Sequence, residues 1–485
     1  MTRAIVAADL DFASGLRRAS GNGGVLTGAD LTGLGVTFAR GRPLNMGGFG
    51  DSRKNQSIGD SGRSLNFRST DCWVDIHSDG RVIHDPTMNF GVSGYSTADV
   101  IANIDTYIAA WVANKVDAVD CWLLTNDPGN GILPAQSAAN CATIIQKVRN
   151  AGILLFWWVE LPRGYLGTAF PYPTGFTTFP PEAEPLLAYH YANIATSQLF
   201  SNNAGVFLVD ASKYVYDPSR TDGSPIQDRY LDGLHPSQRA SYLFGLAFRD
   251  VIVPLIPNIP PFLVQSNSAY NKANNPYGNY IVNGMVQGTA GTIGTNCIAG
   301  SSGSGITPGL CDSFTISSND ANFVGAVSKV VETDAVSGAV TEWQRVVVSS
   351  PGVTTNANPI ITITRTATNL TPPPADGTYI GIGMRARWAA GVSRMRGVQL
   401  RVTGTDSVGG NTYFSALGAI PSDFGDMLSV ACPERTWSAK GMKVPVGGTP
   451  NPSWQLQLYG RQGYADHAFQ FDFRQATLCT RQIQY

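Results

Sequence analysis

The stretch Gly47-Gly48-Phe49-Gly50-Asp51-Ser52-Arg53 decides how the rest of the sequence is interpreted. A short apolar run that ends in Gly-Asp-Ser can raise a serine hydroxyl clear of the end of a strand. Serine is a poor nucleophile at its own pKa, so Ser52 needs a base, a group that orients the base, and hydrogen-bond donors for an oxyanion. We therefore expect these partners elsewhere in the chain.

A candidate base and its orienting group stand together in Asp232-Gly233-Leu234-His235-Pro236. The imidazole of His235 can take the serine proton, and the carboxylate of Asp232 can hold that imidazole in the required tautomer. Pro236 fits the first position of a helix predicted over residues 236–253, where its missing N–H costs nothing. His235 is therefore expected at or just before a helix N-terminus.

Candidate oxyanion donors occur in Asn89-Phe90-Gly91-Val92-Ser93-Gly94 and in Thr125-Asn126-Asp127. Gly94 has no side chain that could block a substrate from its backbone N–H. Each motif alone is weak evidence, because Gly-Asp-Ser is more often a cap or turn and Asp232 can equally cap a helix. The joint arrangement, with Ser52 after the first strand and His235 before the last helix, favours a catalytic site.

Over residues 44–254 these motifs resemble the SGNH (GDSL-type) hydrolases, a family of serine esterases and deacetylases. The resemblance implies that Ser52 is the nucleophile and that His235 is the general base, oriented by Asp232. It also implies an oxyanion hole made by the backbone N–H groups of Ser52 and Gly94 and by the side-chain amide of Asn126.

Leu124 is a departure from that family, because the family pattern Gly-x-Asn-Asp has a glycine where this chain has Leu124. The resemblance implies a three-layer α/β/α fold with a flavodoxin-like parallel sheet, and no cofactor. It leaves open whether the leucine changes the geometry of the oxyanion hole.

The chain has 485 residues, a length that suggests two to three domains. Residues 1–40 show no sustained period and are expected to form a loop-rich leader or attachment segment. Residues 41–262 alternate short apolar runs with helical patterns, as parallel sheets covered by helices do. Strands are predicted at residues 118–124, 153–159 and 206–209. Helices are predicted at 96–112, with Val112 on the apolar face, and at 135–151, 182–202 and 236–253.

Residues 263–485 are predicted to form a separate all-β sandwich. A proline-rich run at residues 256–261 marks the boundary, because prolines at that density cannot continue a helix. Short runs rich in Val, Ile, Thr and Tyr follow, at residues 345–348, 360–364, 379–384 and 398–402. Their pattern resembles the jelly-roll carbohydrate-binding modules of glycan-active enzymes.

Composition excludes several classes of function. The formal net charge is −1 and only 14% of residues are charged, so no basic surface for nucleic acid is indicated. No apolar run is long enough for a membrane span, and residues 1–20 lack the pattern of a signal peptide. Seven cysteines without zinc spacing predict no structural metal. Free buried thiols, a loop closed by Cys297 and Cys311, and a Cys432–Cys479 pair remain open.

Several other residues could bear chemistry, but simpler interpretations are favoured for them. His77, His84 and His190 lack partners at ligand spacing, although His84 is close enough in sequence to the Gly94 loop to touch substrate. Trp157 and Trp158 fit a buried strand better than a sugar platform. Glu160 could be a glycosidase acid, but no paired carboxylate accompanies it.

These observations predict a serine esterase that removes O-acetyl groups from a polysaccharide through an acyl-serine intermediate. The leader and the glycan-binding pattern look like an esterase of a bacteriophage tail spike or fibre, located outside a cell or on a virion. Homo-oligomerisation and attachment to a virion through residues 1–40 are left open. The alternatives are an inactive glycan-binding or structural virion protein and a lipase-like esterase for longer acyl chains.

Overall fold

The described residues divide into two compact units, one within Met1–Ile58 and Arg68–Pro260 and the other within Gly59–Phe67 and Pro261–Tyr485. Most of the leader, the helix expected at 182–202, Asp232 and the prolines at 257–261 lie outside the described residues. The computed structural model describes residues 10–11, 17–18, 43–56, 64–66, 69–161, 206–215, 217–219, 225–231, 233–256, 263–264, 266–267, 278–333, 338–367, 379–405, 412–419, 430–444 and 451–480.

The first unit is built on a five-stranded sheet with the order β5-β3-β6-β7-β8, in which every pair is parallel. Taken in chain order, the strands follow the flavodoxin-like pattern 2-1-3-4-5, which confirms the predicted fold class. In such sheets, ligands bind outside the carboxyl ends of the strands, where the strand order reverses. The strands are β3 (Leu44–Gly50), β5 (Val82–Gly91), β6 (Ala118–Trp122), β7 (Leu154–Trp158) and β8 (Val206–Val209).

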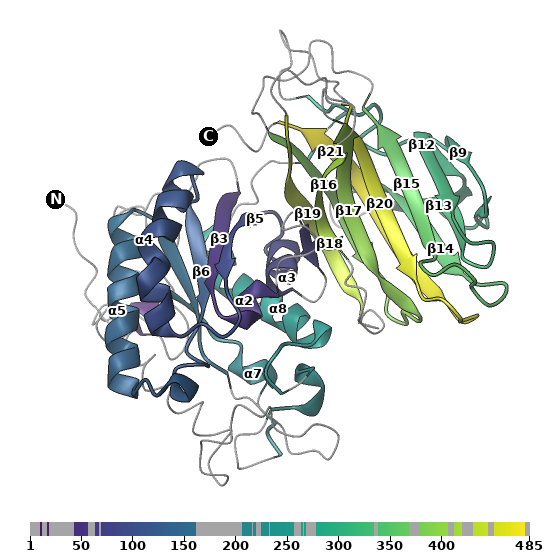
Figure 1. The fold of residues 1–485 in the computed structure, drawn as a ribbon. Helices are drawn as coiled ribbons and strands as arrows, with labels where there is room; N and C mark the ends of the chain where they lie inside the picture. Colours follow the sequence, from purple (N-terminus) through teal and green to yellow (C-terminus); the bar gives the residue numbers. More distant parts are fainter. Residues whose placement is uncertain are drawn as a thin grey trace. The chain divides into compact units, whose positions relative to one another are not determined.

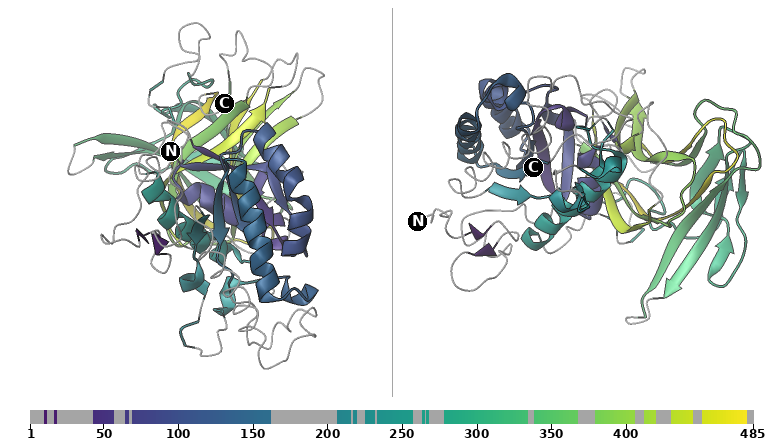
Figure 2. Two further views of the ribbon diagram at one scale, coloured as in Figure 1. Left: turned by 90° about the vertical axis from the view of Figure 1, so that its left-hand side faces the viewer. Right: turned by 90° about the horizontal axis from the view of Figure 1, so that it is seen from below.

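Helices cover both faces of this sheet (Figure 1). The long helices α4 (Thr97–Ala113) and α5 (Pro134–Asn150) lie side by side on one face, as Figure 2 also shows. On the other face α3 (Thr70–His77) packs against α8 (Gln238–Leu255). The shorter helices are α2 (Ser52–Asn55), η3 (Pro128–Asn130), α7 (Ser212–Val215) and η6 (Gln227–Arg229).

Most predicted elements of this unit that lie within the described residues are confirmed, with three differences. The helix after His235 begins at Gln238 and not at Pro236, because the Ser237 side chain caps it by accepting from the Ala240 N–H. Val112, expected on the buried face of α4, is 54% exposed, and Tyr107 is buried instead. Helix α3 and strand β5 lie where no element was assigned.

The paired glycines of β3 make room for large neighbours. A Cβ on Gly47 would lie 2.8 Å from the indole nitrogen of Trp111, and one on Gly48 would lie 2.7 Å from Cε of Lys54. Trp111 is fully buried on one side of the sheet, and Lys54 is buried as well. The two glycines therefore allow a core tryptophan and a charged lysine to approach the same strand.

The second unit is a sandwich of two seven-stranded sheets, as predicted. The sheets pack through aromatic side chains: the Trp454 and Phe473 rings stack with centroids 5.6 Å apart, and the Trp454 indole donates to the Gly383 carbonyl at 3.3 Å. One sheet has the order β10-β13-β14-β21-β16-β19 with β11 beside β13, and the other β4-β18-β17-β20-β15-β12-β9. The strands are β4 (Ser64–Asn66), β9 (Ala290–Ile293), β10 (Cys297–Ala299), β11 (Ile306–Pro308), β12 (Leu310–Ser318), β13 (Val324–Thr333), β14 (Val340–Ser349), β15 (Ile360–Thr366), β16 (Tyr379–Trp388), β17 (Met395–Thr405), β18 (Thr412–Ala419), β19 (Cys432–Lys443), β20 (Ser453–Gly460) and β21 (Ala468–Cys479).

The described part of the chain contains neither of the considered cysteine pairs and no membrane-spanning helix. All seven cysteines are buried free thiols, so neither the Cys297–Cys311 loop closure nor the Cys432–Cys479 pair is present. Burial raises the pKa of the Cys432 thiol to about 12, which makes it unreactive. Among the described helices, none is long and apolar enough to cross a membrane.

Strand β4 comes from the segment between α2 and α3, yet it belongs to the second unit. It pairs in parallel with β18, with Leu65 opposite Leu417, and forms the edge of its sheet. The Leu65 side chain is buried. Residues 59–67 and 261–485 therefore form one compact unit, although about 190 residues separate them in sequence.

This connectivity predicts that a single cut does not separate the two units cleanly. A chain of residues 1–260 keeps β4 without β18, and an unpaired strand edge with an uncovered Leu65 promotes association. We expect it to self-associate, and replacing residues 59–67 with a Gly/Ser linker to restore the monomer. Size-exclusion chromatography with light scattering measures the monomer fraction of the 1–260 chain with and without this replacement. Equal monomer fractions in the two chains would contradict the prediction.

Candidate active site

Ser52 is the first residue of α2 and lies directly beyond the carboxyl end of β3. The chain turns sharply at Gly50, whose φ is +142° and whose Cβ, if present, would lie 1.9 Å from the Trp122 carbonyl oxygen. Asp51 caps α2 by accepting from the Arg53 N–H at 2.9 Å, and its own N–H donates to Trp122 at 3.0 Å. These contacts fix the backbone on both sides of Ser52.

His235 is brought to Ser52 from 183 residues away in sequence. Its Nε2 lies 2.8 Å from Ser52 Oγ, which is hydrogen-bonding distance. The loop before α8 that carries His235 is closed by a bridge between Tyr230 and Pro236 and by a 2.9 Å hydrogen bond from the Leu231 N–H to the His235 carbonyl. The predicted nucleophile and base therefore meet, whereas Asp232 lies outside the described residues.

Gly94 and Asn126 lie on neighbouring loops at the same edge of the sheet. Gly94 has φ +83° and no atom within 4 Å of the position a Cβ would take. The Asn126 amide donates to the carbonyl of Tyr95, the residue after Gly94, at 3.0 Å. Asn55 of α2 donates to Ser93 Oγ at 3.0 Å, so the loop is tied to the helix of the nucleophile as well.

The two predicted backbone donors have no partner among the described residues. Within the ranges that the structure describes, the backbone N–H groups of Ser52 and Gly94 have no hydrogen-bond acceptor. The Asn126 amide has two N–H groups, of which the contact with Tyr95 needs one. All three groups can therefore donate to a substrate oxygen.

Leu124 occupies a backbone conformation that normally requires glycine. Its φ is +99°, and its side chain is buried in the core that α4 and α5 share with the sheet. The turn that follows is held by the Asp127 N–H, which donates to the Leu124 carbonyl at 3.0 Å, and by Asp127 itself, which accepts from Thr97 and Ser137. The departure from the family pattern thus keeps the glycine-like conformation and adds a buried side chain.

Arg53, next to Ser52, is fully buried between two carboxylates. It donates to Asp51 through Nε at 2.9 Å and through Nη2 at 2.5 Å, and both of its Nη atoms donate to Glu160, with Nη2 2.8 Å from Oε2. Its guanidinium carbon lies 4.7 Å from the centroid of the Trp122 ring. Burial alone would lower the pKa of Arg53, but the two carboxylates outweigh it and raise the pKa. Sequence reasoning assigned no role to Arg53.

Lys54 is buried in a second group of charges. Its ammonium pairs with Asp71 and lies 2.7 Å from Asp120 Oδ1. The Lys54 carbonyl also accepts from the Asn89 amide at 3.0 Å. A charged residue inside the apolar run at 118–124 was the available signal for this group, since a buried carboxylate requires a cationic or hydrogen-bonding partner.

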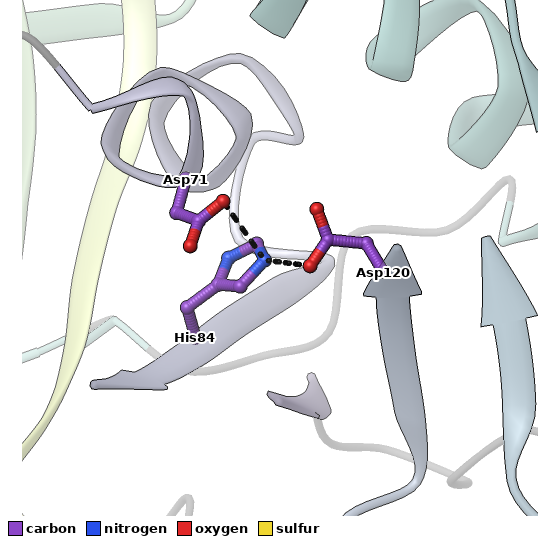
Figure 3. Close-up of side chains that lie close together, drawn as sticks. All are labelled: Asp71, His84 and Asp120. Carbon is purple, nitrogen blue, oxygen red and sulfur yellow. Dashed lines mark ion pairs between the residues drawn. The ribbon is translucent and has the colours of Figure 1, made fainter. Parts of the chain in front are cut away.

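His84 joins the same group of charges (Figure 3). Its Nδ1 lies 2.7 Å from Asp75, and its Nε2 lies 3.5 Å from Asp120 and 3.8 Å from Asp71. Burial alone would lower the pKa of His84, but the surrounding carboxylates raise it to about 10. For the Asp75 carboxyl, burial has the opposite effect: it raises the pKa to about 6, although the neighbouring His84 lowers it.

Asp71, His84 and Asp120 each place a ligand atom within 4.8 Å of the others, as metal ligands do. A metal does not fit this cluster well, because the Lys54 ammonium already pairs with both carboxylates. The surrounding carboxylates also raise the pKa of His84, which favours its protonated form over the neutral imidazole that binds a metal. The negative charge of the carboxylates in this cluster is therefore neutralised by cationic side chains of the protein itself.

Among the remaining candidate residues, those that the structure describes are buried in the core of the first unit. Trp157 and Trp158 are fully buried, as predicted. His77 is buried beside the rings of Trp73 and Tyr242. His190 lies outside the described residues.

Comparisons with known proteins find similar solved structures only. No protein-family model matches the sequence, and no curated protein matches it. A candidate SGNH hydrolase from Slackia heliotrinireducens has 15% identity, covers 43% of this chain and 99% of its own, and has a TM-score of 0.32. A catalytic mutant of an acetylxylan esterase from Geobacillus stearothermophilus has 12% identity, 44% and 96% coverage, and a TM-score of 0.32. At these values the likeness assigns no activity to this chain.

The positive φ of Leu124 predicts an inverted order of stability for two substitutions. Both Leu124→Ala and Leu124→Gly lose the buried side chain, but only glycine relieves the backbone strain. We expect Leu124→Gly to be more stable than Leu124→Ala by about 1 kcal/mol, although a chain with alanine is normally more stable than one with glycine. Urea unfolding of both variants measures this difference. A more stable alanine variant would exclude strain at this position.

The buried His84 cluster predicts a loss of stability at alkaline pH. The pKa of His84 rises from 6.5 to about 10 on folding, so its contribution is complete below about pH 6.5 and is lost between about 6.5 and 10. The free energy of unfolding should therefore fall over this range and fall less steeply in His84→Gln. Urea unfolding at a series of pH values is the measurement. Parallel curves for the two proteins would contradict it.

Proposed function

We propose that this protein is a carboxylic ester hydrolase that acts through an acyl-serine intermediate. The observation that carries the proposal is the 2.8 Å distance between His235 Nε2 and Ser52 Oγ. A serine hydroxyl paired with an imidazole is the minimal device for nucleophilic attack on an ester carbonyl. Ser52 also lies at the carboxyl edge of the sheet, where open α/β folds bind ligands.

The reaction follows from the positions of the side chains. Ser52 Oγ attacks the ester carbonyl carbon while its proton passes to His235 Nε2. The oxygen that becomes negative accepts from the backbone N–H groups of Ser52 and Gly94 and from the free N–H of Asn126. When the tetrahedral intermediate collapses, His235 returns the proton to the leaving alkoxide.

Deacylation repeats these steps with water in place of Ser52. His235 takes a proton from the water, the hydroxyl oxygen attacks the acyl carbon, and the proton then returns to Ser52 Oγ. In this proposal Asp232 orients His235, as its place three residues earlier in the sequence suggests.

The proposed substrate is an O-acetylated polysaccharide, and the proposed product is free acetate with the chain length unchanged. The β-sandwich of the second unit and the low fraction of charged residues, 14%, suit contacts with neutral sugars. Glu160, the residue considered as a glycosidase acid, pairs with Arg53 and is buried, which argues against glycosidic cleavage. A role as a receptor-binding deacetylase of a phage tail, with attachment through residues 1–40, remains part of the proposal.

Ser52→Ala should lower ester hydrolysis by about 10⁴-fold or more, because it removes the nucleophile. The measurement follows acetate release and polymer length together on O-acetylated polysaccharides, with p-nitrophenyl acetate as the small ester. Ser219→Ala, in an exposed part of the same unit, is the matched control and should retain the parent's rate.

Three outcomes would count against the proposal. Hydrolysis by Ser52→Ala within a few-fold of the parent would remove Ser52 as the nucleophile. Shortened polymer chains would indicate a glycosidase or lyase. Faster hydrolysis of long acyl esters than of acetyl esters would favour the lipase-like alternative.

A further inference from the structure

The Arg53 side chain binds one carboxylate close to it in sequence, that of Asp51, and one far from it, that of Glu160. Its guanidinium binds the Asp51 carboxylate, and Asp51 is the residue before Ser52. The same guanidinium binds Glu160, which follows β7 by two residues. Ser52 therefore lies between two residues that a single side chain connects to the central sheet.

Helix α2 depends on such contacts because it has only four residues. A single helical turn is unstable by itself, since nucleation costs more than one turn of hydrogen bonds returns. Arg53 and Lys54 are the two cations that fix α2 to the rest of the unit. Of the two, only Arg53 also holds the cap residue Asp51, and so controls the peptide groups on both sides of Ser52.

The buried Glu160–Arg53–Asp51 set is costly to form. Charged groups lose their hydration on burial, and replacing such a set with apolar side chains is often neutral or stabilising. Stability alone is therefore a poor explanation for placing it here. A set that fixes the direction of a reacting hydroxyl gains from the rigid, two-point geometry of a guanidinium and a carboxylate.

We propose that Arg53 and Glu160 are positioning residues that direct Ser52 Oγ toward His235 and the substrate carbonyl. This inference rests on the proposed esterase function and deepens it. Glu160 anchors the guanidinium from the end of β7, the guanidinium holds the Asp51 cap, and the cap sets the start of α2. Glu160 itself does not touch the substrate and takes no proton.

The test compares Glu160→Gln with the parent, using the full chain. Glu160→Gln keeps the shape of the side chain but removes its charge and points an amide group at the guanidinium. A misplacement of about 1 Å costs up to about 10²-fold in rate. We expect kcat for p-nitrophenyl acetate to fall about 10- to 100-fold, with KM within about threefold of the parent.

The second readout is the rate at which a fluorophosphonate labels Ser52, which reports the nucleophile without a natural substrate. Labelling should slow by a factor similar to that in kcat. The matched control is Asp472→Asn in the second unit, since Asp472 is also buried and accepts from Arg345 at 2.7 and 2.8 Å. The control should lower the melting temperature and leave kcat and labelling unchanged.

The outcomes separate the inference from the function on which it rests. If the parent hydrolyses the ester and is labelled, and folded Glu160→Gln does the same at the parental rate, the positioning role is overturned. If the parent is neither active nor labelled, the proposed function fails, and the inference fails with it. If Glu160→Gln does not fold, Glu160→Asp and Arg53→Lys take its place, and parental kcat in either folded variant overturns the inference.

Discussion

The burial of two consecutive cations directly after Ser52 is the constraint on which the rest of the first unit depends. Arg53 and Lys54 would be prohibitively costly in the interior without the carboxylates that surround them. Those carboxylates come from four different places: the N-cap of α2, helix α3, strand β6 and the end of β7. One turn of helix is thus coupled to most of the unit, and the nucleophile is carried on that turn.

Glycine residues, which lack a side chain, and two tryptophans make this arrangement geometrically possible. Gly48 leaves space for the Lys54 stem, and Gly50 allows the sharp turn against the Trp122 carbonyl. Trp122 also lies under the Arg53 guanidinium and stacks on Trp158, whose indole donates to Asp120 at 2.8 Å. The apolar run that ends in Gly-Asp-Ser is therefore explained by its neighbours across the sheet.

The flavodoxin-like fold could be predicted through the family resemblance that the motifs carry, and the meeting of Ser52 with His235 through the positions of those motifs, although periodicity alone left strand β5 unassigned. The burial of Arg53, Lys54 and Glu160 could not be predicted, since nothing in the sequence shows which charges meet across 107 residues. Strand β4 was missed for a related reason: three residues in a polar segment carry no period, and their partner β18 comes some 350 residues later. The start of the last helix was predicted two residues too early, at Pro236, because the Ser237 side chain caps the helix.

Helix α3 links the two halves of the proposed dyad. Through Asp71 it holds Lys54, and hence the helix of Ser52. Through its other side it packs against α8, where Gly245 allows the helices to approach so closely that a Cβ would lie 2.6 Å from the Trp73 carbonyl. The His235 loop leads directly into α8. One buried helix therefore contacts the helix of the nucleophile through an ion pair and the helix that follows the base through close packing.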